Sequence, residues 1–85
     1  MSRRATTSYL AMLDIAVSAR GHGVADEAMR HAVRNAMRFA PTSDPSLILY
    51  VGPDESGRLL EVGVLTTEHG PLIVHAMRAR PKFLR

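Results

Sequence analysis

A histidine and four permanent cations lie within the last eleven residues of the chain. His75 stands at the end of an apolar, strand-like run, and Arg78, Arg80, Lys82 and Arg85 follow it without any acidic residue. Folding does not require so much positive charge where a strand ends, whereas contact with a polyanion would explain it. In a chain this small, RNA is the polyanion that fits best.

These residue types suit cleavage of RNA by its own 2′-hydroxyl group. That reaction needs a base for the hydroxyl proton, a cation beside the phosphate and an acid for the leaving oxygen, and it needs no metal ion. An imidazole moves protons near neutral pH, and a guanidinium binds phosphate. We therefore predict His75, Arg78 and Arg80 as catalytic residues, with Arg58 and Lys82 as phosphate contacts. The alternative is a strand-terminal histidine followed by a solvated tail.

Three arginines, Arg30, Arg34 and Arg38, recur every four residues in a segment with helical periodicity. On a helix they would form one stripe, which could follow the phosphates of a nucleic acid. We therefore add Arg30 and Arg34 to the predicted nucleic-acid contacts. The alternative is that the stripe is the solvated face of the helix and that Arg30 pairs with Asp26 one turn earlier.

Glu61 is an isolated acid in the middle of a predicted strand. It could act as a general base or orient an arginine. It could equally face solvent or form a cross-strand pair with His75. The strand pattern leaves these alternatives open.

The composition excludes several classes of site. The chain has no cysteine, which rules out disulfides, thiolate metal sites and thiol chemistry, and a reducing, cytoplasmic setting is expected. Its four histidines lack metal-ligand spacing and its glycines form no nucleotide-binding motif, so we predict neither a metal nor a cofactor. No apolar stretch approaches the roughly 20 residues that a membrane-spanning helix needs, so no membrane partner is predicted.

Two helices are predicted in the first half of the chain. From residue 7 to residue 20, apolar residues recur at helical spacing, and Gly21 and Gly23 end this first helix. The second helix begins near Asp26, whose charge complements a helix N-terminus, and it ends before Pro41. A proline disfavours helical conformation in the residue before it.

Three strands are predicted after the helices, at residues 47–51, 58–65 and 72–77. Alternation places Leu60 and Val62 on one face of the second strand and Glu61 on the other, and it places Ile73 and His75 together on one face of the third. The expected fold is α+β, with two N-terminal helices packed on a three-stranded antiparallel β-meander. We expect a single domain, residues 1–85, with flexible ends at 1–6 and 81–85.

Three short segments resemble a known family when they are taken in order. They are His22-Gly23-Val24 followed by Glu27-Ala28, then Arg58 to Val62, and then Ile73 to Ala79. This series is similar to BrnT-type toxins, the ribonuclease components of bacterial type II toxin–antitoxin pairs. Met77 stands where that family has an arginine, and Arg78 stands where it has a lysine.

The resemblance implies a fold related to the RelE superfamily, metal-independent cleavage of mRNA, and neutralisation by an antitoxin encoded next door. We therefore predict a toxin-like protein that cleaves or binds RNA. The alternative is a small, non-catalytic module that binds nucleic acid or a partner protein. The two differ in product, because only an enzyme leaves shortened RNA.

Overall fold

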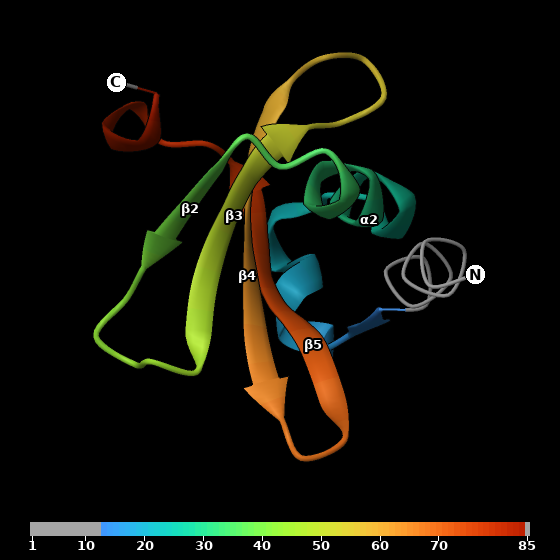
Figure 1. The fold of residues 1–85 in the computed structure, drawn as a ribbon. Helices are drawn as coiled ribbons and strands as arrows, with labels where there is room; N and C mark the ends of the chain where they lie inside the picture. Colours follow the sequence, from blue (N-terminus) through green and yellow to red (C-terminus); the bar gives the residue numbers. More distant parts are fainter. Residues whose placement is uncertain (1–12, 85) are drawn as a thin grey trace, which may run out of the picture.

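The computed structural model describes residues 13–84 and contains one mixed, five-stranded sheet (Figure 1). The strands are β1 (Asp14–Ile15), β2 (Arg38–Pro41), β3 (Leu47–Pro53), β4 (Leu59–Thr67) and β5 (Gly70–Arg78). Their order is β1-β5-β4-β3-β2, with β1 parallel to β5 and every other pair antiparallel. The helical elements are the α-helix α2 (Asp26–Arg34) and the 3₁₀-helices η1 (Val17–His22) and η2 (Pro81–Phe83).

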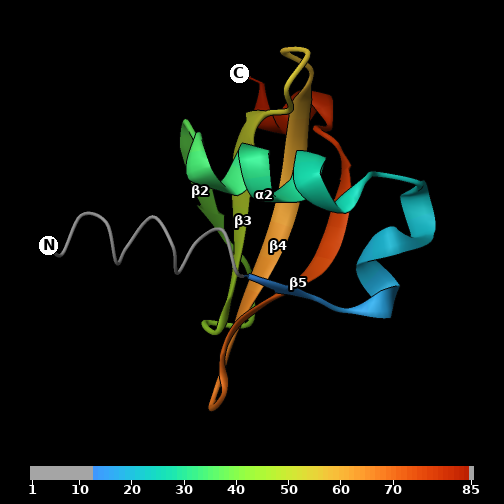
Figure 2. The same ribbon diagram turned by 90° about the vertical axis from the view of Figure 1, so that its right-hand side faces the viewer.

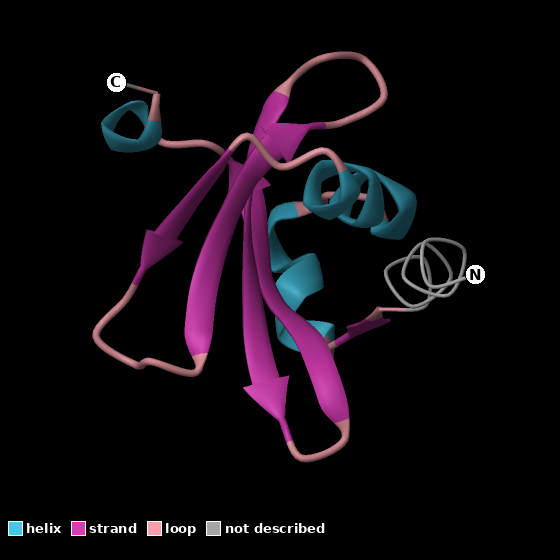
Figure 3. Ribbon diagram, in the orientation of Figure 1, coloured by secondary structure: helices cyan, strands magenta, loops and turns pink. Residues whose placement is uncertain are grey.

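The predicted fold of two helices on a three-stranded meander is wrong. Within the described residues there is one α-helix, and the meander of β3, β4 and β5 is extended by a strand on each side (Figure 3). The predicted α-helix over residues 7–20 is not formed in its described part, residues 13–20, because residues 14–15 pair with β5 and the chain then turns into η1. The rest of that prediction, residues 7–12, lies outside the described residues.

The second helix is shorter than predicted because a strand competes for its last residues. α2 ends at Arg34, and the segment Arg38–Pro41 pairs with β3 instead of continuing the helix. The pairing gives the main chain of β2 hydrogen-bond partners and stacks Phe39 edge-on against Tyr50, with ring centroids 5.0 Å apart. Tertiary pairing of this kind readily outweighs a weak helical preference.

One face of the sheet is covered by α2, which lies across β3 and β4 (Figure 2). The apolar core on this face consists of Leu13, Ala19, Met29, Ala32, Val33, Leu60, Val62, Val64, Ile73 and Ala76. Gly52 allows the helix to approach, because a Cβ at that position would overlap the carbonyl oxygen of Ala32. His31 Nδ1 donates a hydrogen bond to the carbonyl of Pro53, at 2.8 Å, and fixes the helix along the end of β3. No helix within residues 13–84 is long and apolar enough to cross a membrane.

On the opposite face, the C-terminal segment, residues 79–84, which includes η2, lies at one end of the sheet, near the end of β3 and the start of β4 (Figures 1 and 2). Phe83 and Leu84 line a hollow together with Val51 and Leu59 on this side. Because Val51 pairs with Glu61, and Gly63 pairs with His75, these side chains share the face that α2 does not cover.

A β-bulge in β5 places Ile73 and His75 on opposite faces of the sheet. The register shifts between Gly63 and Val64, so that Gly63 pairs with His75 and Val64 pairs with Ile73. The extra residue, Val74, breaks the predicted alternation. Ile73 therefore joins the core on the helix face, while His75 lies on the opposite face.

Candidate functional site

Glu61 is fully buried, and both of its carboxylate oxygens are hydrogen-bonded. Oε1 accepts from the backbone N–H of Arg80 at 3.0 Å and from its Nε at 2.9 Å. Oε2 accepts from Arg80 Nη2 at 2.8 Å and from His75 Nε2 at 3.0 Å. Two of the alternatives drawn from the strand pattern, a pair with His75 and a contact that orients an arginine, are therefore both observed.

The charge on Glu61 is stabilised although the side chain is buried. Burial alone would raise the pKa of this carboxyl group, but the hydrogen bonds from the guanidinium and amide of Arg80, together with the one from His75, lower the pKa below its ordinary value. The same contact raises the pKa of Arg80. A buried acid that stays ionised can fix its two hydrogen-bond donors, Arg80 and His75, in position.

His75 is held in one orientation by this carboxylate. Because an ionised carboxylate only accepts hydrogen bonds, Nε2 of His75 must carry the proton of the shared bond. In the neutral ring, Nδ1 then keeps its lone pair, and the described residues offer it no hydrogen-bond partner. The side chain of His75 is 32% exposed, so a ligand can reach it. The arrangement gives a base whose position is set from the interior of the protein.

A second imidazole, that of His22, lies beside the first. The rings of His22 and His75 are 6.0 Å apart between centroids and meet edge to face at 77°. His22 is the last residue of η1, and η1 is tied to β5 by the hydroxyl of Ser18, which donates to the carbonyl of Val74 at 3.0 Å. Two histidines this close can act as a base and an acid on one substrate.

A hollow of about 330 Å³ adjoins His22 and carries two arginines, Arg58 and Arg78. Both are exposed, and neither forms an ion pair with any residue between 13 and 84. The one acid in the lining, Asp54, accepts hydrogen bonds from Ser56 and from the backbone N–H of Arg58. The two guanidinium groups therefore remain available to an anion.

No family model, curated protein or solved structure matches this chain. The function must therefore be argued from the site itself.

The structure divides the predicted catalytic residues into two groups. His75 and Arg80 meet at Glu61, whereas Arg78 lies in the hollow with Arg58. His22 connects the groups, since it contacts His75 and also lines the hollow. Arg80 is occupied by Glu61, so we assign it a positioning role.

The remaining predicted cations neither bond to Glu61 nor line the hollow. Lys82 lies over the ring of Phe83, with Nζ 5.1 Å from the centroid. Arg30 does not form the ion pair with Asp26 that was considered as the alternative to a nucleic-acid contact. It forms an ion pair with Glu27 at 2.9 Å and donates to the carbonyl of Leu13 at 3.1 and 3.0 Å.

Asp26 instead pairs with Arg20, at 2.8 Å. Arg34 is exposed on α2, and Arg38 lies in β2, so the predicted helical stripe of arginines does not form.

Sequence reasoning did not find His22 as a site residue. His22 and His75 are far apart in the sequence, and only the packing of η1 on β5 brings them together. Gly21 and Gly23, on either side of His22, indicate the end of a helical element and carry no signal that the histidine between them is functional. A local pattern could not reveal this pair.

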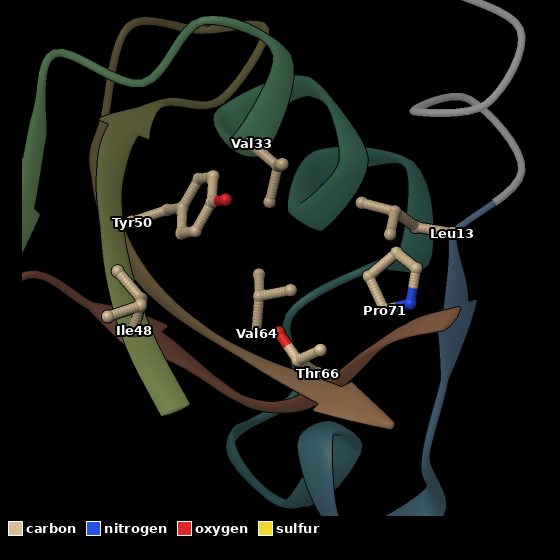
Figure 4. A pocket seen from close by; sticks show the side chains of 7 residues that line it. All are labelled: Leu13, Val33, Ile48, Tyr50, Val64, Thr66 and Pro71. Carbon is tan, nitrogen blue, oxygen red and sulfur yellow. The ribbon is translucent and has the colours of Figure 1, made fainter. Parts of the chain in front are cut away.

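A separate hollow of about 210 Å³ lies below α2 on the helix face (Figure 4). It is lined by Leu13, Val33, Ile48, Tyr50, Val64, Thr66 and Pro71. The lining has no histidine, acid or permanent cation, so it offers no group for the chemistry predicted from the sequence.

Proposed function

We propose that this protein cleaves RNA without a metal ion, at the surface formed by His75, His22, Arg78 and Arg58. The observation that carries the proposal is the pair of imidazoles, one of which is fixed by a buried carboxylate, beside a hollow with two arginines that form no ion pair with the described residues. These are the base, acid and cations that 2′-hydroxyl attack requires.

In this mechanism Nδ1 of His75 takes the proton of the 2′-hydroxyl group. The 2′-oxygen then attacks the adjacent phosphorus, and the bond from phosphorus to the 5′-oxygen breaks. Protonated His22 gives its proton to that leaving oxygen, while Arg78 and Arg58 neutralise the charge that develops on the phosphate. The products are a 2′,3′-cyclic phosphate and a 5′-hydroxyl end. Arg80 acts indirectly, by keeping Glu61 ionised and in place.

The biological setting is a further part of the proposal. The resemblance to BrnT-type toxins supports a cytoplasmic toxin that is neutralised by an antitoxin encoded next door. The chemistry does not depend on that setting and can be tested alone.

The test uses a short RNA and a matching RNA whose 2′-hydroxyls are methylated, both in the presence of EDTA. We expect the wild type to shorten only the unmodified RNA and to leave cyclic phosphate ends. His75→Gln keeps a donor for Glu61 and should lower the cleavage rate by about 100-fold or more. His22→Gln should also lower it. The matched control is His69→Gln, an exposed histidine in the turn between β4 and β5, which should cleave at the wild-type rate.

The outcomes distinguish cleavage from binding. If both RNAs bind with steep salt dependence and neither is shortened, the protein is a binding module and the catalytic proposal is wrong. If His75→Gln cleaves as fast as the wild type, another site is responsible. The biological setting is tested separately. Induced expression of the wild type, beside His75→Gln, shows whether growth arrest follows RNA loss.

A further inference from the structure

The second edge of the sheet, at β2, carries exposed apolar side chains and an open strand. Within the described residues β2 pairs with β3 alone, and no strand covers its outer side (Figure 1). Four large apolar residues are exposed in the described part of the chain, and three of them lie at or beside this edge: Met37 at 63%, Phe39 at 61% and Leu84 at 50%. A strand with free main-chain groups and exposed apolar neighbours is a template for another strand.

The two faces of this edge differ in chemistry. Phe39 pairs with Tyr50, which packs against the core, so Phe39 lies on the helix face. Arg38 pairs with Val51 and therefore points to the opposite face, where its Nη1 donates to the carbonyl of Phe83 at 3.1 Å. The edge is thus apolar on one face and cationic on the other.

The cationic face adjoins an apolar hollow of about 230 Å³. It is lined by Met37, Arg38, Val51, Leu59, Phe83 and Leu84. Arg80 and Lys82 both lie over the ring of Phe83, at 5.4 and 5.1 Å from its centroid. Neither this lining, nor β2, nor the segment 79–84 contains an acidic residue. A second copy of the chain would bring like charges together here, which opposes pairing of two β2 edges.

We propose that β2 binds an extended segment of a partner protein in which apolar and acidic residues alternate. The segment adds a strand to the open edge through main-chain hydrogen bonds. Its apolar side chains lie beside Phe39 on the helix face. Its acidic side chains lie on the other face, near Arg38 and Lys82. Successive side chains of an added strand point to opposite faces of the sheet, so a segment of alternating apolar and acidic residues can place its apolar side chains beside Phe39 and its acidic side chains beside the cations. The inference does not depend on the proposed cleavage of RNA.

The experiment is a selection from a phage library of fully random ten-residue peptides against the wild-type protein. We expect the enriched peptides to alternate apolar residues with Asp or Glu. A synthetic copy of one such peptide should bind Phe39→Glu at least about 10-fold more weakly than the wild type. Val17→Glu is the matched control, because Val17 is 83% exposed in η1 and the change adds the same charge away from β2. It should bind with wild-type affinity.

Three results would overturn the proposal. They are the absence of enriched peptides, enrichment of peptides without an excess of acidic residues, and binding that Phe39→Glu does not weaken. A wild-type dimer in light scattering that becomes monomeric in Phe39→Glu would assign the edge to a second copy of the chain instead. Phe39 is mostly exposed, so the variant should fold, and Met37→Glu provides a second substitution beside the same edge.

Discussion

The two faces of the sheet are covered in different ways. α2 lies on an apolar surface, and the approach is close enough that Gly52 cannot carry a side chain without overlap. The C-terminal segment lies on the other face and is fixed through Arg80 to a buried carboxylate, that of Glu61. Apolar packing holds α2 on the sheet, and a small set of charge-assisted hydrogen bonds holds the C-terminal segment.

This difference places the candidate chemistry. The buried core under α2 contains no charged side chain, whereas Glu61 fixes the C-terminal segment and orients His75 at the same time. One buried charge therefore has a structural and a positioning role. Substitutions at Glu61 and at Gly52 test the C-terminal segment and α2 separately, and the dependence of stability on pH tests the charge of Glu61 alone.

The largest effect is expected on removing the carboxylate. Glu61→Ala leaves Arg80 and His75 without their shared partner and opens a cavity in a buried position, so the free energy of unfolding should fall by about 3 kcal/mol. Urea denaturation measures this loss. Protection of the backbone amide of Arg80 from hydrogen exchange should disappear as well, because its acceptor has been removed.

Glu61→Gln is the matched variant, since it keeps the shape of the side chain and one acceptor oxygen. It should lose less stability than the alanine variant, and the amide of Arg80 should keep some protection. Equal losses in the two variants would contradict this expectation, because the retained shape and acceptor oxygen would then contribute nothing and the carboxylate charge alone would hold the C-terminal segment.

A smaller effect is expected on the helix face. Gly52→Ala would place a Cβ against the carbonyl of Ala32 and 2.9 Å from the Cα of Ala36, and both are backbone atoms that cannot turn aside. Over-packing of this kind costs about 2 kcal/mol. Thermal unfolding of the variant checks the value, and its C-terminal segment should stay as protected as in the wild type.

Gly63→Ala provides the comparison on the opposite face. Its Cβ would meet the Cβ of His75 at 3.1 Å and a side-chain methyl group of Leu49 at 3.4 Å, so the neighbours need to give by only a few tenths of an ångström. At Gly52 the overlap is with backbone atoms closer than 3 Å. We expect a smaller loss than in Gly52→Ala. A larger loss of stability in Gly63→Ala would contradict the view that close backbone contact excludes a side chain only on the helix face.

The strands were easier to predict than the helices, for a physical reason. Residues 47–51 form a continuous apolar run, and residues 58–65 and 72–77 are largely apolar with partial alternation. Strong turn signals flank all three segments, and each lies within an observed strand apart from Arg58. The weakly helical segments were decided by tertiary contacts that a local pattern does not contain. Residues 14–15 pair with β5, and residues 38–41 pair with β3. The predicted fold was therefore wrong at both edges of the sheet, where β1 and β2 were not predicted.

The candidate site was predicted in part. His75 and Glu61 lie on neighbouring strands, so strand alternation could suggest their contact. The same alternation wrongly predicted Ile73 on the face of His75, because the bulge at Val74 has no clear sequence signal. Arg80 was predicted as a catalytic cation, but its pairing with Glu61 requires the C-terminal segment to fold back over the sheet. The contribution of His22 depends on how η1 packs.

The smallest effect expected is a loss of stability in acid that depends on Glu61. Its pKa is lowered in the folded protein, so at pH values between the folded and unfolded pKa the unfolded chain binds more protons and folding weakens as the pH falls. The stabilisation should be complete above the unfolded pKa, about 4.3 for a glutamate, and should be lost as the pH falls through the folded value. Asp26 and Asp54 also have lowered pKa values and act in the same direction. The measurement is therefore the difference between wild type and Glu61→Gln in urea midpoints from pH 7 to pH 2. The two curves should converge in acid, because the wild type then loses the charge that the variant lacks at every pH. Parallel curves would mean that the buried carboxylate does not stabilise the folded state through its ionisation.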